Sequence, residues 1–253
     1  MQLKLICSDI DGTLLNIDRQ LSQNTILEIK KVAPTPFILI SSRMPKAMKH
    51  LQEELGILHL PLIAYNGGLI LVDDKIISST EISNTVAHRI YSFCKDTSLH
   101  ISLYYNDEWY VPKLDFWAQR EANNTKVTPV VQDVVTTLKN WKQEHKGAHK
   151  IMVMGDANEI DSFVHYMGAN LADKVIGYRS KDTYLEIAPK SISKKTAIET
   201  LLAYQYPEMK LKNVLSFGDN YNDIEMLKST GVGVAVANAK REVLAIALSL
   251  IHI

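Results

Sequence analysis

Continuous apolar runs alternate with amphipathic stretches near both ends of the chain. Short, mainly apolar runs of this kind predict strands that are buried on both faces. They lie at Leu3–Ser8, Phe37–Ile40, Leu62–Tyr65, Val214–Phe217 and Val232–Val236. The stretches between them predict helices at Gln23–Val32, Pro45–Leu55, Lys194–Tyr204 and Asp223–Ser229. Such alternation is typical of an α/β fold with a doubly wound, Rossmann-like parallel sheet.

The middle of the chain, from about Ile82 to Ile187, has a different pattern. Val86, Ile90 and Phe93 have helical spacing, and Glu159–Met167 predicts another helix. Strands are predicted at His100–Asn106, Trp109–Pro112, Lys150–Met154 and Tyr184–Ala188. This mixture predicts an α+β domain inserted into the core. We expect the core domain to comprise residues 1–81 and 188–253, and the inserted domain residues 82–187.

Composition narrows the classes of partner. The 28 basic and 28 acidic residues of the 253-residue chain cancel, so no bulk field attracts nucleic acid or an anionic membrane. The two cysteines, Cys7 and Cys94, are far apart and form no metal-binding pattern, which favours a reducing, cytoplasmic setting. Asp9 and Asp11 interrupt the N-terminal apolar run too early for a signal peptide. The composition leaves the oligomeric state open.

Two carboxylates follow the first predicted strand. Asp9 and Asp11 are two residues apart and precede Gly12, at the strand end where open α/β sheets bind ligands. Two acids there require a cation or a proton to coexist, and they can divide the roles of nucleophile and acid/base. The alternatives are a plain Asp-Gly turn and a calcium loop, although the closing Glu of such a loop is absent.

Three further segments carry candidate chemistry, each with a structural alternative. Ser41 follows the second strand and can donate to a phosphoryl oxygen, or it can cap the next helix. Lys194 opens a helix and can neutralise a phosphate or a carboxylate, although paired lysines are commonly solvated. Asp219 and Asp223 follow the Val214–Phe217 strand, where Asp223 can also be an N-cap.

Together these segments resemble the four motifs of the haloacid dehalogenase superfamily of phosphohydrolases. The runs Asp-Ile-Asp-Gly-Thr-Leu-Leu from Asp9 and Gly-Asp-Asn-Tyr-Asn-Asp from Gly218 are the most specific. The order is closest to the Cof-type branch, whose type IIB cap domain lies between the second and third motifs. The resemblance implies that the inserted domain is this cap and that it selects the substrate.

The resemblance also implies roles for individual residues. Asp9 would attack phosphorus to form an aspartyl-phosphate, and Asp11 would protonate the leaving alcohol and then deprotonate water. Ser41 and Lys194 would take the charge of the phosphoryl group. Asn222 and Asp223 would orient metal-bound waters or Lys194. The implied substrate contacts are Gly12, Ser42, Arg43, Asn66 and Asn222.

A Mg²⁺ ion is the implied cofactor. Its implied ligands are Asp9, the backbone carbonyl of Asp11, Asp219 and Asp223, an all-oxygen set of the kind that magnesium prefers. Charge supports this implication, because two like charges ~4 Å apart repel by about 4 kcal/mol at an effective dielectric constant of 20. One lysine cannot balance three carboxylates and a phosphate.

The chain departs from the usual motifs at two places. Ser41-Ser42-Arg43 stands where this branch more often has Thr-Gly-Arg, and Lys195 stands where a glycine usually follows the motif lysine. Lys194 holds the position of the motif lysine and is therefore the expected functional lysine, with Lys195 as a competitor. Arg43 can bind phosphate or form a structural salt bridge, and Asn66 can contact substrate or belong to a turn.

We therefore expect a Mg²⁺-dependent phosphatase that hydrolyses small phosphate esters, with sugar phosphates as the first candidates and nucleotides or pyridoxal phosphate still open. One alternative is a phosphotransferase or mutase of the same superfamily. Another is a non-catalytic phospho-receiver module, which also uses a strand-end Asp, a hydroxyl and a lysine. Asp11 favours a hydrolase over a receiver, because a receiver needs no acid/base at that position.

Overall fold

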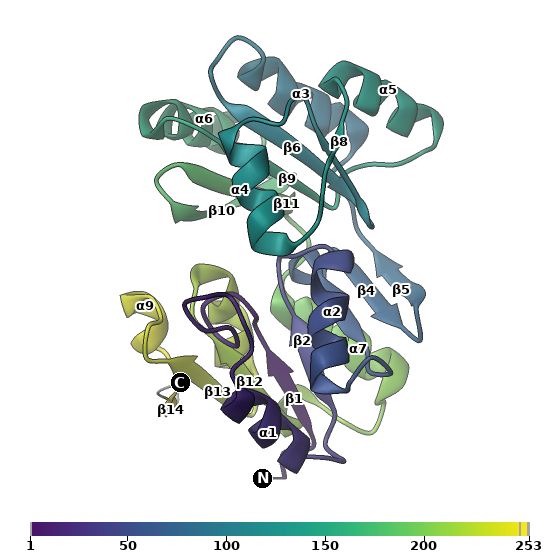
Figure 1. Cartoon of the computed structure of the whole chain (residues 1–253), viewed down its shortest axis with the longest axis vertical. Helices are drawn as coiled ribbons and strands as arrows, with labels where there is room; N and C mark the ends of the chain where they lie inside the picture. Colours follow the sequence, from purple (N-terminus) through teal and green to yellow (C-terminus); the bar gives the residue numbers. More distant parts are fainter. Residues whose placement is uncertain (1, 248, 252–253) are drawn as a thin grey trace. The chain divides into compact units, whose positions relative to one another are not determined.

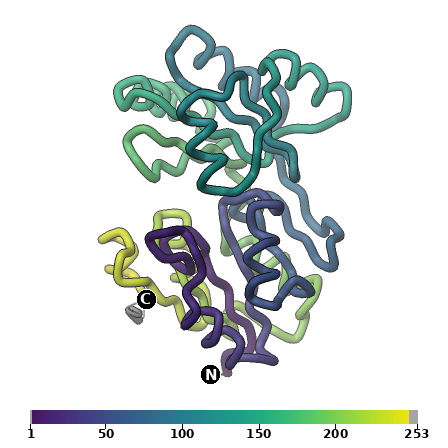
Figure 2. Tube along the Cα trace, viewed as in Figure 1, coloured from purple at the N-terminus to yellow at the C-terminus, as the bar shows by residue number. Residues whose placement is uncertain are grey.

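The computed structural model describes residues 2–247 and 249–251. The chain forms two compact units. One contains the N-terminal part as far as Ser79 together with the part that begins at Ile192, and the other is Thr80–Ser191. The chain trace therefore enters the second unit once, after β5, and returns once, after β11 (Figure 1, Figure 2).

The first unit is built on a sheet with the strand order β14-β13-β12-β1-β2-β3-β4-β5. Its parallel part comprises β1 (Leu5–Ser8), β2 (Phe37–Ile40), β3 (Leu62–Ala64), β12 (Val214–Gly218), β13 (Val232–Val236) and β14 (Ser249–Ile251). β2 and β13 have the predicted bounds, and β1, β3 and β12 differ from prediction by one or two residues at an end. The predicted doubly wound α/β core is confirmed.

An antiparallel hairpin extends this sheet beyond β3. It consists of β4 (Leu69–Val72) and β5 (Lys75–Ser79), neither of which was predicted from the sequence. Its turn residues Asp73 and Asp74 both have left-handed backbones, and β5 is a largely exposed edge strand. The sheet is therefore mixed, with its parallel strands at the site described below.

Helices cover both faces of this sheet (Figure 1). They are α1 (Gln23–Lys31), α2 (Lys46–Leu55), α7 (Lys194–Gln205), α8 (Ile224–Ser229) and the short α9 (Arg241–Leu244). Leu5 and Cys7 of β1 share one apolar core with Ile198 of α7 and Leu227 of α8. Since side chains alternate along a strand, Ile6 and Ser8 point to the opposite face. This burial on two sides explains why the strands are continuous apolar runs.

The second unit has a six-stranded sheet of order β10-β11-β9-β6-β7-β8. Its strands are β6 (His100–Tyr105), β7 (Glu108–Val111), β8 (Val130–Val131), β9 (Lys150–Met154), β10 (Val175–Lys181) and β11 (Tyr184–Pro189). All pairings are antiparallel except that of β7 with β8. The helices are α3 (Asn84–Cys94), α4 (Phe116–Thr125), α5 (Val134–Gln143) and α6 (Ala157–Asn170). The predicted α+β character is confirmed, although α4, α5, β8 and β10 were not predicted.

No helix in residues 2–247 and 249–251 is long and apolar enough to cross a membrane.

Candidate active site

The candidate site lies at the carboxyl ends of the adjacent strands β12, β1 and β2. Asp219, Asp9 and Ser41 each directly follow one of these strands. The Asp9 N–H donates to the carbonyl of Phe217 at 3.0 Å, which continues the β1–β12 pairing by one residue. Parallel pairing therefore brings residues from distant parts of the sequence to one edge of the sheet, as expected for a ligand site in an open α/β fold.

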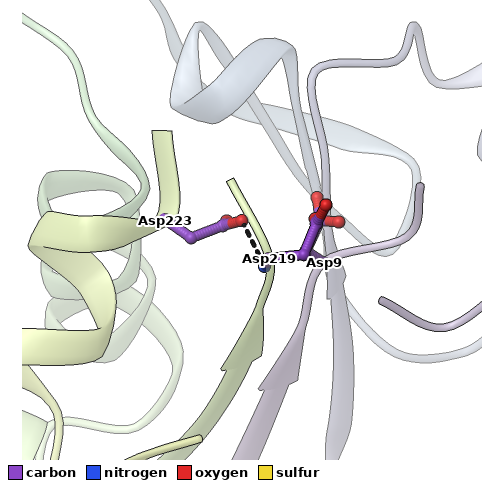
Figure 3. Close-up of side chains that lie close together, drawn as sticks. All are labelled: Asp9, Asp219 and Asp223. Carbon is purple, nitrogen blue, oxygen red and sulfur yellow. Dashed lines mark hydrogen bonds between the residues drawn. The ribbon is translucent and has the colours of Figure 1, made fainter. Parts of the chain in front are cut away.

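Three aspartates form a carboxylate cluster at this edge. One oxygen from each of Asp9, Asp219 and Asp223 lies within 4.8 Å of the others, and Figure 3 shows Asp9 and Asp219 side by side at the ends of their strands. Asp223 is fully buried, and its Oδ2 accepts from the N–H groups of Asp219 and Asn220, both at 3.0 Å. The side chain of Asp223 therefore fixes the loop that carries Asp219.

Lys194 bridges two members of this cluster. Its Nζ lies 2.5 Å from Asp9 Oδ1 and 2.6 Å from Asp223 Oδ1, and its side chain is fully buried. Ser193 caps α7 through a capping box with Thr196, so Lys194 is the first residue of the helix. Lys195, by contrast, is 30% exposed and lies 3.6 Å from Glu199. The structure therefore brings Lys194, and not Lys195, to the aspartates.

The cluster carries more negative charge than its lysine balances. Burial raises the pKa of Asp9 well above its ordinary value, as do the carboxylates of Asp223 and Asp219, although Lys194 opposes the shift. Burial and the charge of Asp223 raise the pKa of Asp219 to about 6. Burial alone would lower the pKa of Lys194, but the carboxylates of Asp223 and Asp9 raise it above its ordinary value.

A divalent cation fits this donor set. Asp9 Oδ2 is buried and has no hydrogen-bond partner among the described residues, although a buried carboxylate oxygen ordinarily requires one. The neighbouring donors are carboxylate oxygens, which suit Mg²⁺. The oxygen chemistry and the excess negative charge thus agree with the predicted magnesium site.

Asp11 and Gly12 occupy the turn after β1. The Asp11 carboxylate is 39% exposed and accepts from Arg43 Nε at 2.6 Å and Arg43 Nη2 at 2.7 Å. Gly12 has φ of +85°, and a Cβ there would lie 2.5 Å from Asp219 Oδ2. Only glycine combines this backbone with so close an approach.

Two further contacts hold the same turn against Asp219 and the segment after β13. Thr13 Oγ1 donates to Asp219 Oδ1 at 3.2 Å, and Asn238 Nδ2 donates to the Gly12 carbonyl at 2.8 Å. Neither residue was among the predicted site residues. Thr13 belongs to the first motif and could have been found there, whereas nothing in the sequence around Asn238 marks it.

The segment after β2 is supported by a strained turn after β3. The Ser41 hydroxyl oxygen accepts from the Arg43 N–H at 3.2 Å, and the Ser41 carbonyl accepts from the Asn66 N–H at 2.8 Å. Ser42, which lies between Ser41 and Arg43 in the sequence, is half-buried. Asn66 is buried with a left-handed φ of 57°, and its Oδ1 accepts from Asn222 Nδ2 at 2.9 Å. Asn66 and Asn222 are thus brought together, on the same unit as the aspartates.

Comparison with known proteins identifies the family. The family model described as haloacid dehalogenase-like hydrolase matches residues 6–252. The chain belongs to the haloacid dehalogenase-like hydrolase family. The family predicted from the four motifs is therefore confirmed, and so is the prediction that the protein is a hydrolase.

Relatives within this hydrolase family match nearly the whole chain. One is a Haemophilus influenzae protein provisionally named a phosphatase, 29% identical over 248 residues, with 96% of this chain and 90% of that protein covered. Another is the 5-amino-6-(5-phospho-D-ribitylamino)uracil phosphatase of Bacillus subtilis, 23% identical over 255 residues, with 92% and 86% covered.

Solved structures show the same fold. A haloacid dehalogenase-like hydrolase from Bacteroides thetaiotaomicron has a TM-score of 0.88 and 26% identity, with 99% of this chain and 94% of that chain covered. A sugar phosphatase of subclass IIB has a TM-score of 0.82 and 20% identity, with 98% and 93% covered, and shares the fold.

Proposed function

We propose that this hydrolase is a Mg²⁺-dependent phosphatase that cleaves small phosphate monoesters through an aspartyl-phosphate on Asp9. The observation that carries the proposal is the buried cluster in which Lys194 bridges Asp9 and Asp223 beside Asp219. A nucleophilic carboxylate, a fixed ammonium group and carboxylates for a cation are what phosphoryl transfer requires at one place.

In the first half-reaction, an oxygen of Asp9 bonds to phosphorus and the ester P–O bond breaks. The leaving oxygen takes a proton from the Asp11 carboxyl group. In the second half-reaction, Asp11 takes a proton from water, whose oxygen bonds to phosphorus and releases the Asp9 carboxylate with inorganic phosphate. The Ser41 hydroxyl and the Lys194 ammonium offset the charge of the phosphoryl oxygens.

Asp9, the backbone carbonyl of Asp11, Asp219 and Asp223 would hold or surround the Mg²⁺ ion. When bound, the ion would supply positive charge against the carboxylates and the phosphoryl oxygens. Gly12 leaves space for Asp219 to approach the turn after β1. The side-chain amides of Asn66 and Asn222 are hydrogen-bonded to each other. We propose that these two residues, together with Ser42 and Arg43, contact the substrate or support the residues that do.

We further propose that the unit Thr80–Ser191 is a cap that selects small, soluble phosphate esters in the cytoplasm. Sugar phosphates are the first candidates. In support, one structure of the same fold is named a sugar phosphatase, and one relative is named a 5-amino-6-(5-phospho-D-ribitylamino)uracil phosphatase.

Phosphate release from a panel of esters tests the proposal. The panel combines glucose 6-phosphate, ribose 5-phosphate, glycerol 3-phosphate, a nucleoside monophosphate, pyridoxal phosphate and p-nitrophenyl phosphate, each with MgCl₂ and with EDTA. We expect metal-dependent release from one or more esters, loss of release in Asp9→Asn, and retained Mg²⁺ binding without turnover in Asp11→Asn. No release by the wild type from any ester would reject a phosphatase, and normal turnover by either variant would reject the role given to that aspartate.

A further inference from the structure

The guanidinium group of Arg43 forms two hydrogen bonds with the Asp11 carboxylate. Nε and Nη2 of Arg43 donate to Oδ2 and Oδ1 of Asp11, at 2.6 and 2.7 Å respectively. This is the two-pronged geometry in which arginine fixes a carboxylate in direction as well as position. Arg19 adds a single contact from Nη1 to Asp11 Oδ1 at 3.3 Å, from a side chain that is 45% exposed.

Arg43 is itself firmly held, unlike Arg19. Its side chain is only 5% exposed, and its Nη1 donates to the Ala47 carbonyl in the first turn of α2 at 3.1 Å. Its backbone N–H donates to Ser41 Oγ at 3.2 Å, and its carbonyl accepts from the Tyr65 N–H at 3.1 Å. Nε, Nη1 and Nη2 thus all donate to protein oxygens, so the guanidinium plane is fixed before a substrate arrives.

We infer that Arg43 is a positioning residue that orients Asp11 for proton transfer, an inference that rests on the proposed phosphatase function. The Asp11 carboxyl group is at a partly exposed turn, where an aspartate without a fixed partner would sample several rotamers. When the carboxyl group carries a proton, one oxygen can still accept from the guanidinium while the other holds the proton. At least one of the two contacts therefore aims the group in each half-reaction.

Two other roles for Arg43 make different kinetic predictions. If Arg43 bound the phosphoryl group directly, its loss would slow every ester alike, because all esters share that group. If its bond to Asp11 were only structural, its loss would lower stability and leave the relative rates of different esters unchanged. A positioning role is instead selective, because a sugar alkoxide needs a proton to leave, whereas p-nitrophenolate leaves readily without one.

The decisive experiment compares Arg43→Lys with wild type on the alkyl phosphates of the panel and on p-nitrophenyl phosphate. Lysine keeps the charge but loses the fork. Because kcat/KM includes only steps up to release of the alcohol, it reports the first half-reaction without the second. General acids contribute about 10²–10⁴-fold, so we expect kcat/KM for the best alkyl ester to fall by about 10–100-fold. The ratio of alkyl to aryl kcat/KM should fall by about tenfold or more.

The second half-reaction gives an independent readout. With p-nitrophenyl phosphate, Arg43→Lys should slow attack of water on the aspartyl-phosphate, so kcat and KM should fall together and a burst of p-nitrophenolate should precede the steady state. Arg241→Lys, at an exposed arginine of α9, is the matched control. It should change neither the ratio of alkyl to aryl kcat/KM nor the kcat and KM for p-nitrophenyl phosphate.

An unchanged ratio of alkyl to aryl kcat/KM in a folded Arg43→Lys protein would overturn the inference. The thermal denaturation midpoint of each variant is measured alongside, and Arg43→Gln serves as a second variant if Arg43→Lys fails to fold. These outcomes differ from failure of the proposed function, in which the wild type itself would release no phosphate.

Discussion

Replacing Lys194 by Met removes the positive charge that the carboxylate cluster surrounds. The Lys194 side chain is fully buried, with its Nζ 2.5 Å from Asp9 Oδ1 and 2.6 Å from Asp223 Oδ1. Removing one partner of a buried ion pair typically costs about 3–5 kcal/mol, because it leaves the other charge uncompensated. We therefore expect the free energy of unfolding of Lys194→Met to be lower than that of wild type by about this amount at neutral pH in EDTA.

Guanidinium denaturation with EDTA and with MgCl₂ is the assay. A cation that binds only the folded state raises the free energy of unfolding, and it should do so more in Lys194→Met, where the carboxylates lack the ammonium. The loss in EDTA should also shrink as the pH falls toward 4, because protonation neutralises the carboxylates of Asp9 and Asp219, whose pKa is raised by burial and by the neighbouring carboxylates.

Lys195→Met is the matched control, because this neighbouring lysine is 30% exposed and its loss should change the free energy of unfolding by no more than about 0.5 kcal/mol. A Lys194→Met protein that is as stable as wild type in EDTA, or that gains no more from Mg²⁺, would refute the electrostatic reasoning.

Two other positions give separate tests. Gly12→Ala would place a Cβ 2.5 Å from Asp219 Oδ2 on a backbone with φ of +85°, so we expect Mg²⁺ affinity to weaken by about 10–100-fold. A Mg²⁺ titration of phosphate release measures this, and an unchanged requirement would contradict it. Burial lowers the pKa of His149 to about 4, and its Nδ1 accepts from the Asn106 N–H. Between about pH 6.5 and 4, His149 is protonated in the unfolded chain but stays neutral in the folded protein. The free energy of unfolding should therefore fall as the pH drops over this range, by up to about 3 kcal/mol. His149→Gln should flatten this fall in pH-dependent denaturation, and an equally steep fall would show that other groups cause it.

The apolar pattern predicted the strands around the site well. β2 and β13 have the predicted bounds because each is a continuous apolar run covered on both faces. The same rule also fits β4, whose four residues are apolar and buried, although β4 was not predicted. It does not extend to β5, which is an exposed edge strand, or to the turn, which depends on two left-handed aspartates. In the second unit, α4 was missed because Ala118 is the only residue of this helix that is buried among those described, so it lacks an apolar stripe.

The sequence by itself determined the residue types and their places at strand ends: Asp9 after β1, Asp219 after β12 and Lys194 at the start of α7. These depend on local patterns, namely apolar runs, a helix cap and the edge that parallel strands share. Only the tertiary structure decided which charges meet. It placed Lys194 rather than Lys195 beside the aspartates and paired Arg43 with Asp11. Such contacts join segments that are dozens to hundreds of residues apart in the sequence. A local sequence pattern does not specify which of these distant segments come into contact, because the packing of strands and helices decides it.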